Sequence, residues 1–228
     1  MWVGYDLSMS SLSGTVQGVS VVTTTWNEKE NIEELISRVR TTLKEIPHEI
    51  IVVDDSSSDG TLETARRIAD MAVSKVREGQ TKGLLYGMKI AKFPILVTID
   101  ADLENDPEFI PTLLQKLDQV DLAVASRTIV PRFSERFASR TLGKKLGVSD
   151  FYSNFRAYKK ETLEDLTLRG GETFGGELLI KVKKKGFKVG EIKYEAPPRR
   201  SAPRIGGNIR ANLRISAATL KCLLIFYF

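Results

Sequence analysis

One stretch of this 228-residue chain decides its fold: residues 93–114, which read FPILVTIDADLENDPEFIPTLL. The stretch begins with an apolar run and ends with a helical segment that carries Pro107 in its first turn, a position where proline is well tolerated. Four acids lie between these two parts, at Asp100, Asp102, Glu104 and Asp106. A buried strand followed by a polar turn and a helix is the repeating unit of an α/β sheet, so we predict this fold class.

The same order of strand and helix recurs through the first 126 residues. Apolar, β-branched runs predict strands over residues 19–24, 48–55, 71–76, 93–100 and 121–126. Helices are expected between them, over residues 26–46, 58–70, 81–92 and 107–120. This alternation predicts a mostly parallel, Rossmann-like sheet covered by helices on both faces.

Beyond Arg127 the pattern becomes weaker, because residues 127–150 are polar and basic and show no strong period. A helix is expected over residues 173–185, a strand over 187–194 and an amphipathic helix from residue 208 onward. We therefore expect a leader over residues 1–18, one domain over 19–207 and a C-terminal amphipathic helix over 208–228.

Composition and charge narrow the range of functions. The chain is 42% hydrophobic and 28% charged, as in ordinary globular proteins. Its net charge of +5 is uneven, since residues 181–214 hold eleven Lys or Arg but only two acids. Such a region suits a phosphate-bearing partner, an anionic membrane surface or a solvated face. A single cysteine, Cys222, excludes an internal disulfide, so a cytoplasmic location is expected, with peripheral contact to the membrane as one option.

Polar clusters follow three of the predicted strands: TTTWNE, DDSSSDGT and DADLE. In open α/β sheets, ligands bind outside the carboxyl ends of the strands. Single acids often cap helices, and this is the competing interpretation for Asp59. Three clusters at one edge of a sheet predict a binding site.

Three interpretations of the acids at residues 100–106 compete. A calcium loop requires Gly at its sixth position and Glu at its twelfth, where this chain has Asn105 and Pro111. A phosphatase of the haloacid type has Asp-x-Asp-x-Thr, and Glu104 replaces that Thr. A metal–diphosphate site needs one or two carboxylates that hold Mg²⁺ or Mn²⁺ together with substrate phosphates, which Asp100 and Asp102 can provide.

Other nucleotide-binding classes lack their sequence signals. The TTTWNE segment contains no glycine, which excludes the Gly-x-Gly-x-x-Gly loop of dehydrogenases, and no Gly-Lys-Ser/Thr of a P-loop is present. Recognisable aromatic motifs for base stacking are missing, so no specific nucleic-acid binding is expected.

With these residues in place, the chain resembles the family 2 glycosyltransferases of the GT-A fold, and within them the dolichol-phosphate mannose synthase branch. The resemblance lies in eight segments that follow the family's order over roughly residues 19–212: VVTTTWNEKENI, IIVVDDSSSDGT, TKGLLYGMKIAK, LVTIDADLENDPEFIPTLL, DLAVASR, SDFYSNFRAYKK, GELLIKVKKKGFKVGEI and PRIGGNIR. Each segment alone is weak, but the ordered set is specific.

The resemblance implies roles for particular residues. The nucleotide-sugar would be bound by Thr25, Trp26, Glu28, Asp54, Asp55, Lys82, Asp100, Ala101 and Asp102. The Mg²⁺ or Mn²⁺ ion would be held by Asp100, Asp102 and Glu104. Catalytic roles fall to Asp102, Arg127, Glu177 and Arg204. Arg136 and Arg140 match no family position, but as arginines they are candidates to bind phosphate together with Arg127 and Arg204.

The implied reaction is an inverting transfer of a sugar from a GDP- or UDP-sugar to a polyprenyl or dolichyl phosphate. An acceptor phosphate is already an anion and needs no general base, whereas a saccharide or other hydroxyl acceptor would need one. Glu177 is the candidate base for such an acceptor, and a structural carboxylate is its competing interpretation. A hydroxyl acceptor and a degenerate, non-catalytic nucleotide-sugar-binding protein both stay open.

Three departures from the family pattern fall at identifiable positions. Trp26 stands where the family usually has Tyr, Asn154 replaces the Gly of SGFRA, and Ile209-Arg210 replaces a Ser-Lys pair. The C-terminal helix presents apolar residues beside Arg214 and Lys221. It is therefore expected either to lie on anionic lipid, to pack on its own domain or to form a homodimer.

Overall fold

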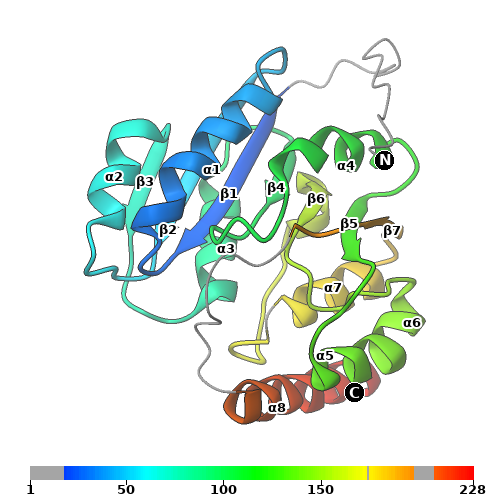
Figure 1. Ribbon diagram of the computed structural model, residues 1–228. Helices are drawn as coiled ribbons and strands as arrows, with labels where there is room; N and C mark the ends of the chain where they lie inside the picture. The colour runs from blue at the N-terminus through cyan, green and yellow to red at the C-terminus, as the bar shows by residue number, and fades with distance from the viewer. Residues whose placement is uncertain (1–17, 174, 198–207) are drawn as a thin grey trace.

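The computed structural model describes residues 18–173, 175–197 and 208–228. Within these residues it forms one seven-stranded sheet with the order β3-β2-β1-β4-β6-β5-β7 (Figure 1). The strands are β1 (Val19–Thr25), β2 (His48–Asp54), β3 (Met71–Ser74), β4 (Ile95–Thr98), β5 (Leu122–Arg127), β6 (Arg156–Lys159) and β7 (Val189–Tyr194). Each strand expected from the apolar runs is present, and the mostly parallel sheet is confirmed.

One strand, β6, was not predicted. It pairs antiparallel with both β4 and β5, whereas the other pairs of the sheet are parallel. Its four residues, RAYK, are too few to show a period, so the sequence carried no clear strand signal there. The insertion of β6 separates β4 from β5 and widens the sheet at this point.

Helices cover both faces of the sheet (Figure 1). On one face, α1 (Lys29–Thr42) and α4 (Ile110–Lys116) bury apolar residues at helical spacing, and α2 (Thr61–Ile68) adds Ala65. On the other face, α3 (Gln80–Ile90) and α7 (Gly176–Lys184) form a second core. A short 3₁₀ turn over Pro107–Phe109 precedes α4. The carboxylate of Asp59 accepts hydrogen bonds from the backbone N–H groups of Thr61 and Lys29, which supports the capping interpretation of this acid.

The basic stretch after Arg127 is helical, although it showed no apolar period. It contains α5 (Phe133–Ala138), a π-helical turn over Ser139–Gly143 and α6 (Lys144–Leu146). The inward positions are partly polar or small, which hides the helical spacing from a hydrophobic pattern: Ser134, Glu135, Ala138, Ser139, Leu142 and Leu146. Polar groups in these positions are tolerated because they are hydrogen-bonded or paired.

The C-terminal helix α8 (Asn208–Tyr227) packs on the domain. It lies against α5 and α7 and buries Ala211, Ile215, Ala218 and Cys222. Packing on its own domain, one of the three expectations for this helix, is thus observed for one of its faces. Across the described ranges 18–173, 175–197 and 208–228, no helix is long and apolar enough to cross a membrane.

Candidate functional site

The acid clusters meet where the strand order reverses. Strand β1 pairs with β2 on one side and with β4 on the other, and all three are parallel, so their carboxyl ends share one edge of the sheet. Thr25 pairs in register with Asp54 at this edge, and Asp100 follows the neighbouring end of β4. Such a reversal is where α/β sheets bind ligands, so the predicted convergence of the clusters is confirmed.

Asp54 lies fully buried at the end of β2. Its Oδ1 accepts hydrogen bonds from Thr25 Oγ1 at 2.9 Å and from Ser57 Oγ at 2.5 Å, and its Oδ2 accepts one from Ser57 N at 2.8 Å. These bonds fix the turn after β2 against the end of β1. Asp54 and Thr25 therefore form part of the buried base of the site at this edge of the sheet.

Asp55 holds the segment that leads into α3. Its carboxylate is buried, forms an ion pair with Lys75, and accepts hydrogen bonds from the backbone N–H groups of Glu78 and Gly79 at 3.0 and 3.1 Å. Burial by itself would raise the pKa of Asp55, but the bonds from Lys75 and the two N–H groups outweigh it and lower this pKa below its ordinary value. Asp55 thus stays ionised and anchors residues 75–79.

The remaining predicted nucleotide residues lie around this edge. The guanidinium of Arg77 stacks on the ring of Trp26, with its Cζ 3.5 Å from the ring centroid. Glu28 is buried and accepts a hydrogen bond from Asn31 Nδ2 at 2.9 Å. Lys82 is exposed and pairs with Glu78, which lies four residues earlier and before the start of α3, and Ala101 is buried.

Asp100 is held by two amides. Gln80 Nε2 donates to its Oδ1, and Asn105 Nδ2 donates to its Oδ2 at 3.4 Å. The surrounding protein desolvates the carboxyl and raises the pKa of Asp100, although the positive charge of Arg127 and the two amides oppose this shift. The same charge links Asp100 to Arg127 at the end of β5.

Asp102 and Glu104 do not complete a three-acid metal site with Asp100. Asp102 Oδ1 accepts a hydrogen bond from Glu104 N at 3.1 Å, and both side chains are half-buried. Among the described residues, no group of three or more His, Cys, Asp or Glu side chains is placed to hold a metal ion. The predicted three-residue ligand set is therefore not formed, while Asp100 and Asp102 still provide the one or two carboxylates that suffice when substrate phosphates complete the shell.

Arg127, predicted to contact phosphate, is already paired with acids. Its Nε lies 2.6 Å from Asp150 Oδ2, and its second terminal nitrogen lies 3.4 Å from Glu135 Oε2. Arg132 approaches the other oxygen of Glu135 at 2.8 Å. Asp150 is fully buried, so this network fixes Arg127 at the sheet edge.

Glu177 has the geometry of a structural carboxylate. It is fully buried, accepts hydrogen bonds from the N–H groups of Arg169 and Gly170 at 2.7 and 2.6 Å, and pairs with Lys181 at 2.7 Å. Burial raises the pKa of Glu177, but these three donors outweigh burial and lower it. We therefore assign Glu177 no role as a base. Arg204, the fourth predicted catalytic residue, lies outside the described residues.

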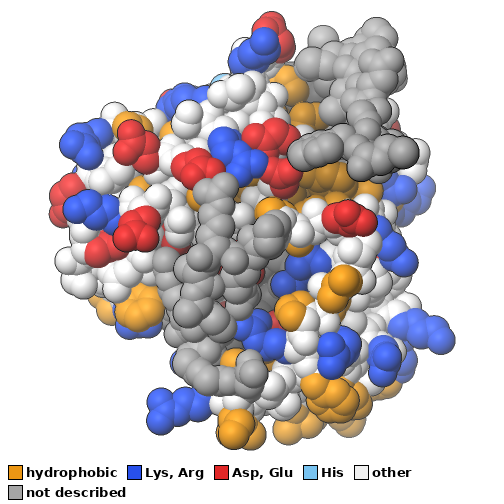
Figure 2. All heavy atoms as spheres, viewed as in Figure 1, with side chains coloured by type: hydrophobic (Ala, Val, Ile, Leu, Met, Phe, Trp, Pro, Cys, Tyr) orange, Lys and Arg blue, Asp and Glu red, His pale blue; other side chains and the backbone are white. Residues whose placement is uncertain are grey.

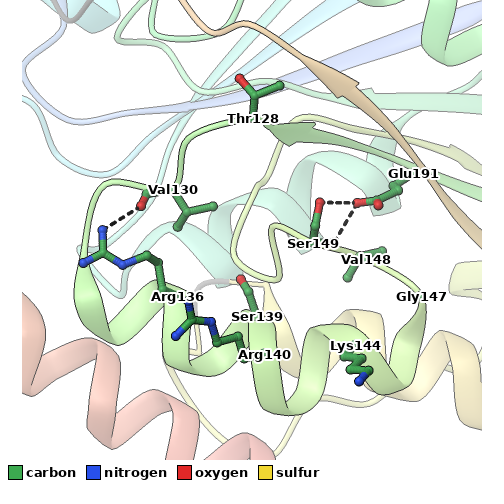
Figure 3. Close-up of a pocket in the computed structure, with 10 residues that line it drawn as sticks. All are labelled: Thr128, Val130, Arg136, Ser139, Arg140, Lys144, Gly147, Val148, Ser149 and Glu191. Atoms are coloured by element: carbon green, nitrogen blue, oxygen red, sulfur yellow. Dashed lines mark hydrogen bonds between the residues drawn. The ribbon is translucent and has the colours of Figure 1, made fainter.

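A cavity of about 780 Å³ opens beside Thr128, between the end of β5 and the helices α5 and α6 (Figure 3). Its cationic lining comes from Arg136, Arg140 and Lys144. Its one lining acid is Glu191, whose Oε2 accepts hydrogen bonds from the N–H and hydroxyl groups of Ser149 at 2.6 and 2.7 Å. Within the described chain, no ion pair joins the three cations to an acid. The cavity lining is thus mainly cationic, so we refer to it as the basic cavity.

Several site residues were missed by sequence reasoning. Gln80, Asn105 and Asn154 lie around Asp100, and Lys144 and Glu191 line the cavity. Gln80 and Lys144 belong to no quoted motif, whereas Asn105, Asn154 and Glu191 lie in quoted segments but were given no role there. The one available signal was Asn154, which stood out as a departure from the SGFRA pattern.

Comparisons with known proteins identify the family and the fold. Dolichol-phosphate mannosyltransferase of Pyrococcus furiosus is 33% identical over 198 residues, which cover 77% of this chain and 55% of that protein. Undecaprenyl-phosphate 4-deoxy-4-formamido-L-arabinose transferase of Edwardsiella ictaluri is 31% identical over 169 residues, covering 66% of this chain and 51% of that protein. The chain thus spans about half the length of the curated relatives it matches.

Among solved structures, glucosyl-3-phosphoglycerate synthase of Mycobacterium tuberculosis, in complex with Mn²⁺, uridine diphosphate and glucosyl-3-phosphoglycerate, superimposes with a TM-score of 0.79. The match covers 97% of this chain and 86% of that one at 24% identity. This likeness confirms the predicted fold of the GT-A type. The family model described as "Glycosyl transferase family 2" matches residues 20–176, well over half of the chain. This protein belongs to glycosyl transferase family 2.

Proposed function

We propose that this protein is a metal-dependent, inverting glycosyltransferase that moves a sugar from a nucleotide-sugar to a polyprenyl phosphate at a membrane surface. One observation carries the proposal: the charge of Arg127 acts on Asp100 at the sheet edge, and Thr128, the next residue, lines a cavity whose cations form no ion pair among the described residues. The first region suits a metal–diphosphate group and the second an anionic acceptor.

The donor side is assigned to the carboxyl ends of β1, β2 and β4. Trp26, Asp54 and Asp100 lie at this edge, which offers an aromatic face and carboxylates for a base and a ribose. The synthase of Mycobacterium tuberculosis has been crystallised with uridine diphosphate and either Mn²⁺ or Mg²⁺, which supports a nucleotide-sugar donor here. A thermal-shift assay with GDP and UDP distinguishes the two possible donor nucleotides.

Asp100 and Asp102 would hold the Mg²⁺ or Mn²⁺ ion. When bound, the ion would neutralise the diphosphate as it leaves, which is Lewis-acid chemistry. The protein's own part is to present the two carboxylates at a fixed place. Arg127 opposes the rise in the pKa of Asp100, and it lies at the end of β5, next to Thr128 of the cavity lining.

The acceptor side is assigned to the cavity. Arg136, Arg140 and Lys144 would bind the acceptor phosphate, which as an anion needs cations and no general base. One of its oxygens forms a bond to the anomeric carbon while the bond from that carbon to the nucleoside diphosphate breaks, with inversion. The engagement of Glu177 by its own neighbours is consistent with a reaction that needs no base there.

Transfer to a hydroxyl group is the second candidate, because Glu191 places one carboxylate in the cavity wall beside Ser149. A hydroxyl acceptor needs a base to take its proton, and Glu191 is the one carboxylate of the lining. Burial raises the pKa of Glu191, but the hydrogen bonds from Ser149 outweigh burial and lower it, as the donors around Glu177 do, so this candidate ranks second. The structural relative from Mycobacterium tuberculosis was crystallised with phosphoglyceric acid, a small anionic compound. The two acceptor classes are separated by direct assay.

A membrane-facing surface is assigned to the helices below the cavity. Exposed apolar side chains project from α5, at Phe133 and Phe137, and from α8, at Leu213 and Leu220. Figure 2 shows hydrophobic side chains interspersed with Lys and Arg along this lower margin of the molecule. Apolar groups among cations are typical of surfaces that lie on anionic lipid.

The first experiment is a thermal-shift assay with GDP, UDP and their sugar conjugates, with Mn²⁺ and then with EDTA. A ligand at a hundred times its dissociation constant stabilises a protein by about 2.7 kcal/mol. We expect one nucleotide class to stabilise the protein only with metal. That donor is then offered with a polyprenyl phosphate in detergent or with 3-phosphoglycerate, and transfer to neither would contradict a catalytic role.

The membrane contact is tested by flotation with vesicles that contain phosphatidylglycerol. Leu213→Glu and Phe133→Glu should release the protein from these vesicles. Val76→Glu, which changes an exposed apolar residue outside this surface, should not. Equal flotation of all variants would exclude this surface, and self-association that Leu213→Glu abolishes in the absence of lipid would indicate a homodimer instead.

A further inference from the structure

The side chain of Gln80 connects two regions that are far apart in the sequence. It lies at the first residue of α3 and donates its Nε2 to Asp100 Oδ1 after β4. Its Oε1 accepts a hydrogen bond from Asn154 Nδ2 at 3.1 Å. The three side chains therefore form a continuous chain, Asn154 to Gln80 to Asp100.

The carboxylate of Asp100 determines the donor and acceptor at each of these hydrogen bonds. An ionised Asp100 can only accept, so Gln80 must turn its amide nitrogen toward it and its oxygen away. The oxygen then requires a donor, which Asn154 provides. A residue without a side-chain donor at position 154 would leave Gln80 fixed at one end only.

Asn154 is itself held in place by the backbone. Its main-chain oxygen accepts a hydrogen bond from Thr98 Oγ1 at 2.5 Å, next to the end of β4. Its side-chain oxygen lies where a Cβ on Gly175 would come within 2.5 Å, and Gly175 has φ of +73°, a conformation that favours glycine. The fold thus keeps room for the Asn154 side chain and fixes its direction.

The segment that carries Asn154 also borders the basic cavity. Ser149 lines the cavity, and Asp150 pairs with Arg127, four residues before Asn154. On the other side of Asp100, Asn105 donates to Oδ2 and is fixed in turn by Tyr194, whose hydroxyl donates to Asn105 Oδ1 at 2.5 Å. Both oxygens of Asp100 therefore receive amide donors that have supports of their own.

We propose that Gln80 and Asn154 are positioning residues, which set the orientation of Asp100 so that it can bind the metal–nucleotide part of the donor. The proposal rests on the proposed function and adds to it a specific pair of residues. Outer groups that orient metal-binding or substrate-binding side chains commonly contribute much of the affinity of such sites. Asn154, a departure from the family pattern, then has a defined task in this chain.

The test uses the full chain and measures Mn²⁺ binding by electron paramagnetic resonance, alone and with UDP or GDP. The variants are Gln80→Leu, Asn154→Ala and the double variant. Gln115→Ala, an exposed glutamine on α4, is the matched control. We expect Gln80→Leu to weaken nucleotide-dependent Mn²⁺ binding about 10- to 100-fold. Asn154→Ala should weaken it by a smaller factor, and the control should not change it.

The double variant separates positioning from a general loss of structure. If Asn154 acts through Gln80, the double variant should bind as Gln80→Leu does, because the second change has nothing left to support. In transfer assays, the KM for the donor should rise while the KM for the acceptor stays constant. A structural defect would instead lower the thermal midpoint and change both constants together.

Each outcome decides the proposal. Wild-type affinity in Gln80→Leu, or losses that multiply in the double variant, would overturn it. If Gln80→Leu unfolds, Asn154→Ala carries the test alone, because it leaves the bond to Asp100 intact. If the wild-type protein binds neither nucleotide with Mn²⁺, the proposed function is overturned. If the wild type and the variants all bind nucleotide and Mn²⁺ equally well, only the positioning role is overturned.

Discussion

The acidic sheet edge and the basic cavity differ in how their charges are satisfied. At the sheet edge, Asp54, Asp55 and Asp100 each accept hydrogen bonds from protein donors. In the cavity, Arg140 and Lys144 face the solvent with no acid partner within the described part of the chain. The edge is therefore held in shape by the protein itself, whereas the charge of the cavity is left for a ligand to neutralise.

Substitutions in the two regions are therefore expected to have different effects. A change at the edge disturbs groups that are already bonded, so it affects the arrangement of the site and in part the stability of the fold. A change in the cavity removes a charge that faces water, so it affects binding and little else. Substitutions on each side of this contrast test it.

Asp102→Ala should have the largest effect on activity. Asp102 is proposed to hold the metal ion and is half-buried at the end of the edge. Loss of a group that stabilises charge in the transition state commonly costs about 1,000-fold, and we expect at least this loss in the rate of transfer. The thermal midpoint should stay near that of the wild type, and an active Asp102→Ala protein would contradict the site assignment.

Arg127→Ala should have the largest effect on stability. The substitution leaves the buried carboxylates of Asp150 and Glu135 without their shared cation. Removing one partner of a buried ion pair costs about 3–5 kcal/mol, so the free energy of unfolding in urea should fall by this amount.

Arg140→Ala serves as the matched control, because it removes an exposed arginine of the cavity. Its free energy of unfolding should stay within about 0.5 kcal/mol of the wild type. Equal losses of stability in Arg127→Ala and Arg140→Ala would contradict the proposed difference between the sheet edge and the cavity.

The same Arg140→Ala variant, and Lys144→Ala, should weaken binding of the acceptor. A hydrogen bond to a charged group contributes about 1.5–3 kcal/mol, so the KM for the acceptor phosphate should rise roughly 10- to 100-fold. The KM for the donor should stay constant. Lys183→Ala, which removes an exposed lysine of α7, should change neither constant, and a parallel loss in Lys183→Ala would point to general charge effects.

Asp55→Asn should give the smallest effect, and one that depends on pH. The folded state lowers the pKa of Asp55, so its charge stabilises the fold above the unfolded pKa and this contribution is lost as the pH falls through the folded value. We expect a loss of about 1–2 kcal/mol at pH 7. The gap between variant and wild type should narrow below about pH 4 in urea titrations. A gap that is constant with pH would show that the charge of Asp55 does not contribute.

Sequence patterns succeeded where neighbouring residues carry the signal. The apolar strands β1, β2 and β4 and the periodic helix α1 follow directly from the order of their residues. The acids at the strand ends were predicted to share one edge, because parallel strands must place their carboxyl ends together. Strand β6 was missed because its four residues are too few to show a period, and helices α5 and α6 were missed because several of their inward positions carry polar or small side chains.

The sequence by itself determined the α/β class, the parallel core of the sheet and the placement of Asp54, Asp100 and Asp102 at strand ends. It did so because burial and strand direction depend on local, periodic features of the chain. Only the tertiary structure decided that Glu177 is bonded to the 169–170 turn and that Asn154 reaches Asp100 through Gln80. Those contacts join residues from separate elements, and their geometry is set by how the elements pack.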